Sequence, residues 1–293
     1  MKAISLLITT NIAIMAMLAV VVKVLGLEPV LAANGLNLTS LFIVSAVMGF
    51  AGSFISLLMS KTMAKRRMGV QLIEQPQNQT EAWIYKTVER MSGELGIKMP
   101  AVGIFHSDAP NAFATGASKN NSLVAVSTGL LQIMNRDEVE AVIGHEMSHV
   151  NNGDMVTSTL LQGVLNTFVY FFARIVAQVV SSNSRDGQSA GASYFMISML
   201  MQVVLGVLAS MVVMWFSRHR EYHADRGGAA LTSTQSMANA LRALKRMQEG
   251  GVQMALPDQM AAFGITAFGG LFATHPPLEK RIAALEAQSN VIS

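Results

Sequence analysis

Four long apolar stretches constrain the fold of this chain more than any other feature of its sequence. They cover residues 3–22, 38–60, 157–180 and 194–216. Each is long enough to cross a bilayer as an α-helix, which takes about 20 apolar residues. Such segments must satisfy their own backbone hydrogen bonds in lipid, and a helix does so. The sequence therefore predicts an α-helical integral membrane protein with four transmembrane helices, arranged as two hairpins.

The composition of the chain agrees with that prediction. Of its 293 residues, 51% are hydrophobic and 13% are charged, whereas a typical soluble domain has about 25% charged residues. The net charge is only +3, and the basic residues form no patch with interleaved aromatic side chains, so no nucleic-acid partner is expected. The chain has no cysteine, which excludes thiolate metal ligands. The expected partner of its apolar surface is the lipid bilayer.

Lysine and arginine residues near the spans orient the chain, because short cytoplasmic flanks are enriched in them. Basic clusters follow the second and the fourth span, whereas the linkers 23–37 and 181–193 contain one basic residue each. Both hairpins should therefore begin and end in the cytoplasm. The expected segments are the transmembrane hairpins 1–61 and 157–216, and the two parts of a cytoplasmic domain, 62–156 and 217–293.

The polar segments have the patterns of an α+β domain. Apolar residues at helical spacing predict a helix over 80–95. Asn135, followed by Glu138, predicts the start of a second helix, which should end near residues 151–154. Short β-prone runs bounded by Gly, Pro, Asn and Ser predict a small sheet. These runs cover 101–105, 111–116 and 122–127, and further helices are expected at 234–248 and 278–288.

The second of these helices contains His145-Glu146-Met147-Ser148-His149. Residues four apart share one face of a helix, so His145 and His149 can present two imidazole nitrogens to one metal ion at about 2.0–2.1 Å. Glu146 points away from that pair and can take a proton from a metal-activated water. The pattern predicts zinc-assisted hydrolysis of an amide bond by one Zn²⁺ per subunit. Two chance histidines on a surface helix are the alternative.

A catalytic zinc ion usually has three protein ligands and a water, so the motif lacks one ligand. The candidates are His106, His219, Glu221, His223 and His275. An antiparallel hairpin of the third and fourth spans would bring residues 145–149 next to 218–225, which favours Glu221. Asp225, one helical turn further on, could orient a ligating histidine. The site would then lie only about 7 Å beyond Phe216 along the helix, near the membrane surface.

Further motifs accompany the zinc pattern along nearly the whole chain. They are Ser53–Lys61, Glu74-Gln75-Pro76, Asn111–Gly116, Val124–Leu131, His145–Met155, Trp215–Asp225 and Thr274–Arg281. Together they resemble the HtpX family of bacterial membrane zinc metallopeptidases, which is related to the CAAX prenyl endopeptidases. The resemblance implies a zincin-type catalytic domain of the gluzincin class. It also implies a multi-pass protein of the bacterial inner membrane.

The resemblance implies roles for the residues of the metal site. Zinc would be bound by His145, His149 and Glu221. Glu146 would act as general base and then as general acid. Asp225 would be the hydrogen-bond partner of a ligand.

The resemblance also implies residues that contact the substrate. His275 would donate to the developing oxyanion, and the alternative is a turn residue before two prolines. An edge strand would bind extended substrate by β-addition, and the alternative is an ordinary buried strand. The residues of this strand are Asn111, Ala112, Phe113 and Ala114.

Other polar positions are expected to have no catalytic role. We interpret Arg281 as a solvated helix charge, and the alternative is a side chain that orients a group or forms an ion pair near the metal site. Arg174 lies within a span and is a functional-site candidate, but we interpret it as a side chain that extends to the membrane surface. His219 and His223 should lie near the lipid headgroups. Gly144 is unusual inside a helix, and close packing beside the substrate strand would explain it.

For the function, the resemblance implies an endopeptidase that degrades damaged or misassembled membrane proteins, with unfolded proteins as further substrates. An ATP-dependent membrane protease is an expected partner. One alternative is the processing of prenylated C-termini, and another is a non-enzymatic membrane module with a structural zinc. The latter would leave Glu146 without a role. Shielding of the zinc by residues 250–275 is a further hypothesis.

Overall fold

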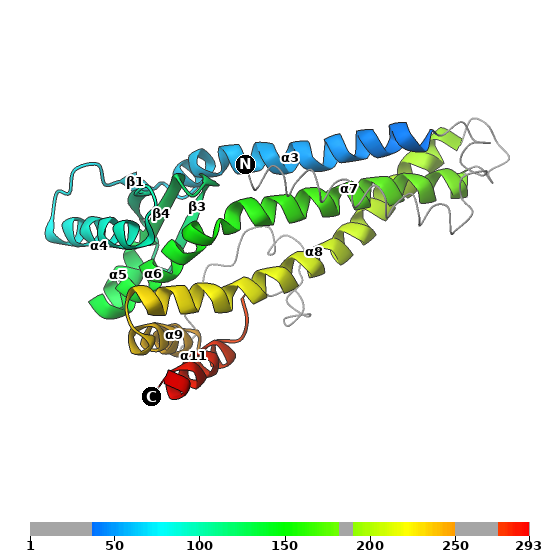
Figure 1. Cartoon of the computed structure of the whole chain (residues 1–293). Helices are drawn as coiled ribbons and strands as arrows, with labels where there is room; N and C mark the ends of the chain where they lie inside the picture. Colours follow the sequence, from blue (N-terminus) through cyan, green and yellow to red (C-terminus); the bar gives the residue numbers. More distant parts are fainter. Residues whose placement is uncertain (1–36, 182–189, 250–274, 293) are drawn as a thin grey trace. The chain divides into compact units, whose positions relative to one another are not determined.

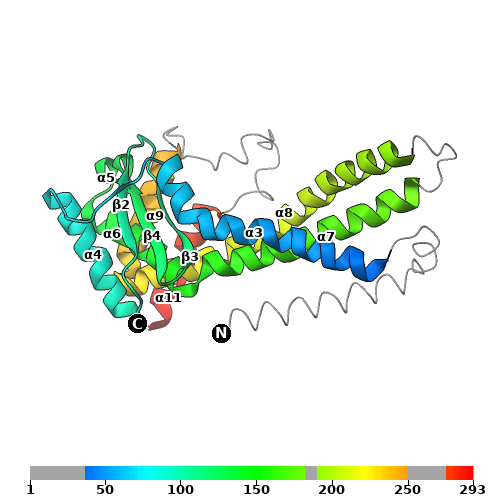
Figure 2. The same cartoon turned by 90° about the horizontal axis from the view of Figure 1, so that it is seen from above.

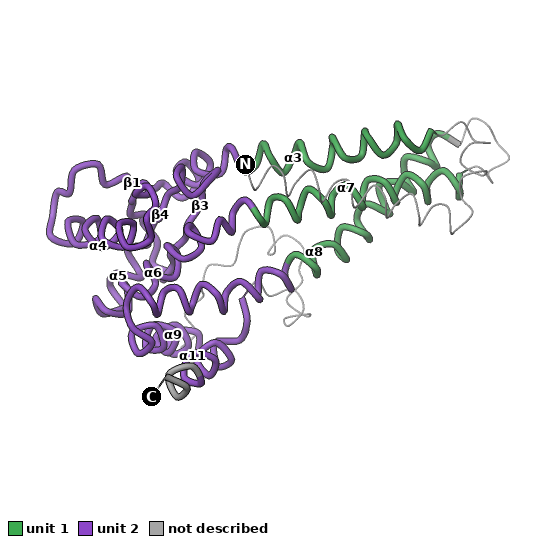
Figure 3. Tube along the Cα trace, viewed as in Figure 1, with its two compact units in different colours: residues 1–56, 157–213 green, residues 57–156, 214–293 purple. Residues whose placement is uncertain are grey.

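The computed structural model describes residues 37–181, 190–249 and 275–292 (Figure 1). The span expected over 3–22 and residues 250–274 of the hypothesised shield lie outside the described residues. The chain divides into two compact units (Figure 3): unit 1 comprises residues 1–56 and 157–213, and unit 2 comprises residues 57–156 and 214–293.

The described residues of unit 1 belong to the apolar parts of three long helices. These are α3 (Leu38–Arg67), α7 (Asp154–Ser181) and α8 (Ala190–Leu231). Each is long and apolar enough to cross a membrane. They contain the predicted spans 38–60, 157–180 and 194–216, and each helix is longer than its predicted span. Helix α8 continues without a break well past the end of its apolar stretch.

Helices α3 and α7 lie side by side in both views (Figures 1 and 2) and approach each other at two glycines. A Cβ on Gly49 would lie 2.6 Å from the backbone nitrogen of Thr167, and one on Gly163 would lie 2.5 Å from the ring of Phe50. Asn166 donates to the carbonyl of Gly49 at 3.4 Å. Small residues and interhelical hydrogen bonds stabilise helix pairs in lipid, so this contact suits a membrane.

Unit 2 contains a four-stranded sheet with the order β1-β2-β4-β3. The strands are β1 (Gln71–Leu72), β2 (Ala101–Phe105), β3 (Ala112–Ser118) and β4 (Asn121–Ser127). Strand β4 pairs in parallel with β2 and antiparallel with β3, and β1 pairs antiparallel with β2. The three β-prone runs correspond to β2, β3 and β4. The two-residue strand β1 was not expected, because it is too short to show a pattern.

Strand β4 is buried on both faces, which explains its nearly continuous apolar sequence. Val124 and Val126 pack into the main core of unit 2, whereas Leu123 and Ala125 pack into a second cluster. Within the part of the chain that the structure describes, β3 lies at one edge of the sheet.

Helices of unit 2 complete its core. They are α4 (Gln79–Leu95), α5 (Thr128–Ile133), α6 (Arg136–Asn152), α9 (Thr234–Glu249) and α11 (Leu278–Ile292). All but α5 were predicted. The expected capping box opens α6, since Asn135 and Glu138 exchange backbone-to-side-chain hydrogen bonds, each of 3.0 Å. Gly153 ends α6 with a φ of 70°, a left-handed conformation that favours glycine.

Helix α6 and the polar end of α8 approach each other closely at glycine positions. A Cβ on Gly144 would lie 3.3 Å from the Cα of Gly228, and one on Gly228 would lie 2.9 Å from the backbone nitrogen of His145. A Cβ on Gly227 would overlap the side chain of Ser148. Gly144 is therefore a close-packing position, but its expected partner was wrong. It packs against α8 and not against a strand.

We expect Gly228→Ala to destabilise unit 2 by about 1–3 kcal/mol, because the added methyl group overlaps the backbone of α6. Thermal unfolding of the full chain in detergent, followed by circular dichroism, measures the change. Gly93→Ala in α4 is the control, because a Cβ there meets nothing within 4 Å and alanine is the better helix former. Equal melting temperatures for the two variants would contradict this packing argument.

Candidate metal centre

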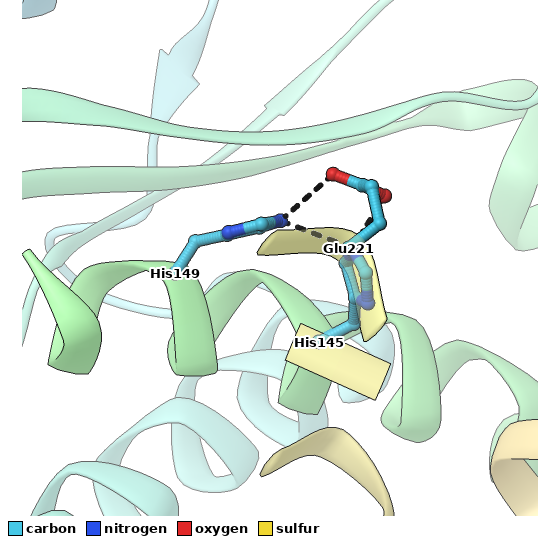
Figure 4. Close-up of side chains that lie close together, drawn as sticks. All are labelled: His145, His149 and Glu221. Carbon is cyan, nitrogen blue, oxygen red and sulfur yellow. Dashed lines mark hydrogen bonds and ion pairs between the residues drawn. The ribbon is translucent and has the colours of Figure 1, made fainter. Parts of the chain in front are cut away.

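His145 and His149 extend from α6 towards Glu221 on α8, and the three side chains meet (Figure 4). The Nε2 atoms of the two histidines are 3.2 Å apart. The carboxylate of Glu221 places Oε2 at 3.5 Å from Nε2 of His145 and Oε1 at 3.4 Å from Nε2 of His149. Atoms bound to one tetrahedral metal ion at 2.0–2.1 Å lie roughly 3.3 Å from each other. The three groups therefore fit a single metal ion.

The electrostatics of the cluster favour a positive charge between its members. Burial opposes a charge on His149, but hydrogen bonds to Asp154 and Glu221 outweigh it and raise the pKa of this histidine to about 10. Burial also opposes ionisation of Glu221, which lies beyond the apolar stretch of α8. Hydrogen bonds from three histidines nevertheless hold the pKa of its carboxyl well below the usual range. A metal ion would supply the same positive charge in place of protons.

A carboxylate holds the outer nitrogen of each histidine. Asp225 Oδ1 lies 3.0 Å from Nδ1 of His145, and Asp154 Oδ2 lies 2.6 Å from Nδ1 of His149. When each Nδ1–H donates to its carboxylate, Nε2 is left to face the cluster. Asp154 was missed in the sequence, where its segment was interpreted only as a helix end. Its position directly after the C-cap Gly153 was the available signal.

Arg281 is buried, so its interpretation as a solvated helix charge was wrong. Only 6% of its side chain is exposed. Its Nε and Nη2 donate to the two carboxylate oxygens of Asp225 at 2.8 and 2.6 Å, and its Nη1 lies 3.3 Å from Oε2 of Glu221. Helix α11 thus brings a guanidinium group to the edge of the metal centre.

The other candidate ligands lie differently. His275 contacts the cluster from outside, with Nδ1 at 2.7 Å from Oε2 of Glu221 and 61% of its side chain exposed. His219 and His223 are exposed on α8, where their rings pack 5.5 Å apart. His106 is also exposed. Among the candidates in the described part of the chain, Glu221 is the one that completes the cluster.

Glu146 is partly exposed on α6, and its charge contributes to the raised pKa of His149. Arg174 belongs to unit 1. It donates to the carbonyl of Tyr170 at 3.3 Å and lies over the ring of the same residue. These local contacts within α7 assign Arg174 no chemical role.

The strand β3 presents backbone groups at the edge of the sheet. Ala112 and Ala114 pack against the main core, whereas Phe113 packs into the cluster on the other face. The backbone N–H of Ser127 donates to the carbonyl of Asn111 at 2.8 Å. Since hydrogen-bonded pairs alternate along an antiparallel ladder, the N–H and C=O groups of Ala112 and Ala114 are directed away from β4. Strand β3 also packs against α6, the helix that carries both histidines.

Residues 78–289 match the model of peptidase family M48. The chain belongs to this family. The peptidase is 54% identical over 293 residues to the protease HtpX homologue of Thiobacillus denitrificans, with 98% of this chain and 99% of the relative covered. It is 51% identical over 293 residues to protease HtpX of Hydrogenovibrio crunogenus, with 98% and 97% covered. The resemblance to the HtpX family is thereby confirmed.

The crystal structure of S. mikatae Ste24p has the same fold. Its TM-score with this peptidase is 0.61 at 16% identity, and the match covers 95% of this chain and 66% of Ste24p. As a metallopeptidase, the chain requires a metal ion. In the described part of the molecule, His145, His149 and Glu221 are the group that could hold it.

Metal binding should release protons. His149, with a pKa of about 10, carries a proton at neutral pH in the metal-free chain and must lose it to bind a metal. The apparent affinity for zinc should therefore increase as the pH rises towards 10. Calorimetric titration with zinc at about pH 7, in two buffers of different ionisation enthalpy, measures the protons released. We expect at least one per ion, and a heat that does not depend on the buffer would count against His149 as a ligand.

Proposed function

We propose that this chain is a membrane-embedded, zinc-dependent endopeptidase that degrades damaged or misfolded membrane proteins at the cytoplasmic face of the bacterial inner membrane. The observation that carries the proposal is the cluster of His145, His149 and Glu221, at the spacing of a tetrahedral metal site. A structural zinc site usually has four protein ligands. The described residues supply three, and a fourth position for water or substrate is typical of catalysis.

The residues around the cluster fit the chemistry of peptide hydrolysis. When bound, zinc supplies a Lewis acid that polarises the scissile carbonyl and makes water more acidic. Glu146 takes the proton of the attacking water and delivers it to the leaving amine. Its partial exposure on α6 leaves it accessible to both. Asp225 and Asp154 hold the two imidazoles in the tautomer that directs Nε2 to the cluster.

His275 has two roles within this proposal. Its Nδ1 contacts Glu221 at 2.7 Å, so it orients the carboxylate of the third ligand. If that nitrogen donates to Glu221, the other ring nitrogen can donate to a developing oxyanion only when the ring is doubly protonated.

The free edge of β3 is the proposed substrate site. An extended peptide can pair with the backbone of Asn111, Ala112, Phe113 and Ala114 by β-addition. Such pairing uses the outward N–H and C=O groups of Ala112 and Ala114. It would hold a peptide along the strand that packs against α6.

The proposed membrane topology has four spans. Residues 3–22 would form the first, and α3, α7 and α8 contain the other three. A cytoplasmic position of both hairpin bases is supported by the basic clusters Lys61, Lys65, Arg66, Arg67 and Arg218, Arg220. The catalytic domain would consist of residues 62–156 and 217–293, and the hairpins of 1–61 and 157–216.

Degradation of damaged membrane proteins is the proposed role, together with an ATP-dependent membrane protease that would act beside this one. The test is reconstitution of the full chain in vesicles with a helical membrane protein and with a destabilised variant of that protein. The destabilised variant should be cleaved faster. Equal rates would contradict a role in quality control and leave the peptidase chemistry untouched.

We expect Glu146→Gln to reduce cleavage of an unfolded model protein by about 10²–10⁴-fold, because the amide cannot accept the water proton. The zinc content should stay at that of the original chain, since Glu146 is not a ligand. Glu140→Gln, on the same helix and in an ion pair with Arg90, is the matched control and should keep its activity. A Glu146→Gln variant with normal turnover would refute the proposed base.

Replacing Ala114 by proline removes one outward N–H of β3, whereas Ala114→Ser retains it. One net hydrogen bond contributes about 0.5–1.5 kcal/mol, so Ala114→Pro should raise the KM for an extended peptide by roughly 2- to 12-fold. Steady-state kinetics measure this change, with the zinc content as a check on the metal site. Equal KM values for the proline and serine variants would exclude pairing of the substrate at this position.

A further inference from the structure

Two series of side-chain contacts, each of three residues, end at the metal centre. In the first, Arg281 binds Asp225, and Asp225 contacts Nδ1 of His145 at 3.0 Å. In the second, Arg220 binds Asp154, and Asp154 contacts Nδ1 of His149 at 2.6 Å. Each histidine is thus backed by an aspartate, and each aspartate by an arginine from another helix.

On the basis of the proposed zinc site, we propose that Arg281 and Arg220 are positioning residues. They fix the two aspartates, so that both imidazoles direct Nε2 to one point before zinc binds. Arg281 acts on His145 through Asp225 and also contacts Glu221 directly. Arg220 acts on His149 through Asp154.

The burial of Arg281 and Asp225 supports this assignment. Only 6% of the Arg281 side chain and 2% of the Asp225 side chain are exposed. A guanidinium cannot lose its charge by deprotonation, so Arg281 is stable there only as the partner of carboxylates. The two parallel hydrogen bonds to Asp225 fix the plane of that carboxylate. The orientation of the carboxylate in turn fixes the ring of His145.

Arg281 also contacts the third proposed ligand. Its Nη1 lies 3.3 Å from Oε2 of Glu221, while Oε1 of the same carboxylate lies 3.4 Å from Nε2 of His149. One guanidinium from α11 therefore contacts carboxylates at two positions of α8. The C-terminal helix becomes part of the metal centre without contributing a ligand.

The contacts of Arg220 with Asp154 join the start of α7 to α8. Arg220 Nη1 donates to the backbone carbonyl of Asp154 at 2.6 Å and lies 3.5 Å from its Oδ1. The guanidinium also lies over the ring of Phe216, at 5.1 Å from its centroid. These contacts fix the first turn of α7, which carries the carboxylate that holds His149.

The measurement that tests the proposal is zinc affinity of the full chain in detergent, by competition with a chromophoric chelator. Arg281→Met and Arg220→Met should each weaken zinc binding by about 10–100-fold, the usual effect of losing such an outer contact. Arg281→Lys restores the charge but not the two parallel donors, so it should recover only part of the affinity. If Arg281→Met does not fold, the lysine variant decides, and unchanged affinity in it would overturn the role of the paired donors.

The matched control is Arg242→Met. This arginine also pairs with a carboxylate across two helices, Glu286 of α11, but the two side chains are 37% and 50% exposed. It should leave zinc affinity unchanged, even if it lowers the melting temperature. An equal loss of affinity in Arg242→Met would show a general effect of loosening α11 and would overturn the proposal.

A double-mutant cycle separates action through the aspartate from a direct effect. If Arg281 acts through Asp225, the variant with both Arg281→Met and Asp225→Asn should lose less affinity than the product of the two single losses. If the double variant instead loses zinc affinity by the full product of the two single losses, the proposed action of Arg281 through Asp225 is overturned. A wild-type chain that binds no zinc would overturn the proposed function itself, which is a different and distinguishable result.

Discussion

The two helices that carry the cluster of two histidines and one glutamate, α6 and α8, approach each other closely at two glycines. The axes of packed helices lie 8–10 Å apart, depending on the side chains at the contact. Gly144 and Gly228 remove the side chains that would set a larger separation, and a Cβ on either would press against the other helix. Glycine weakens a helix by about 1 kcal/mol relative to alanine. Here that loss permits the close approach of the two helices that carry the proposed ligands.

Around this contact between α6 and α8 lie charged side chains that would be unstable if each were buried alone. Glu221, Asp225 and Arg281 are all nearly fully buried, and an isolated ion there would carry a large desolvation penalty. Each instead has a partner of opposite charge or a hydrogen-bonding histidine. The arrangement is a connected network, in which removing one member leaves another charge uncompensated. The network also positions the proposed ligands, because each is held by groups that are not themselves ligands.

Local signals in the sequence were sufficient for most of the helices and strands, but not for the long-range contacts of the site. The caps at Asn135 and Gly153, the zinc motif, the helical spacing of apolar residues and the β-prone runs all act within a few positions of the chain, so they can be recognised without a structure. Glu221 could be favoured from the hairpin of the third and fourth spans. The burial of Arg281 could not, because a single arginine on an amphipathic helix has the same pattern whether it faces water or a carboxylate. Nor could the pairing of Gly144 with Gly228, which depends on the crossing of two helices far apart in the sequence.

The edge position of β3 bears on which proteins such a peptidase would cleave. Pairing at a strand edge uses backbone N–H and C=O groups, which every residue except proline carries in full, so it selects extended conformation more than sequence. A folded transmembrane helix has already satisfied those groups internally and cannot offer them. A damaged or misassembled membrane protein exposes segments whose backbone is free to pair. A site that reads the backbone would therefore distinguish damaged from intact proteins without recognising any particular sequence, which is the property that the proposed role in quality control requires.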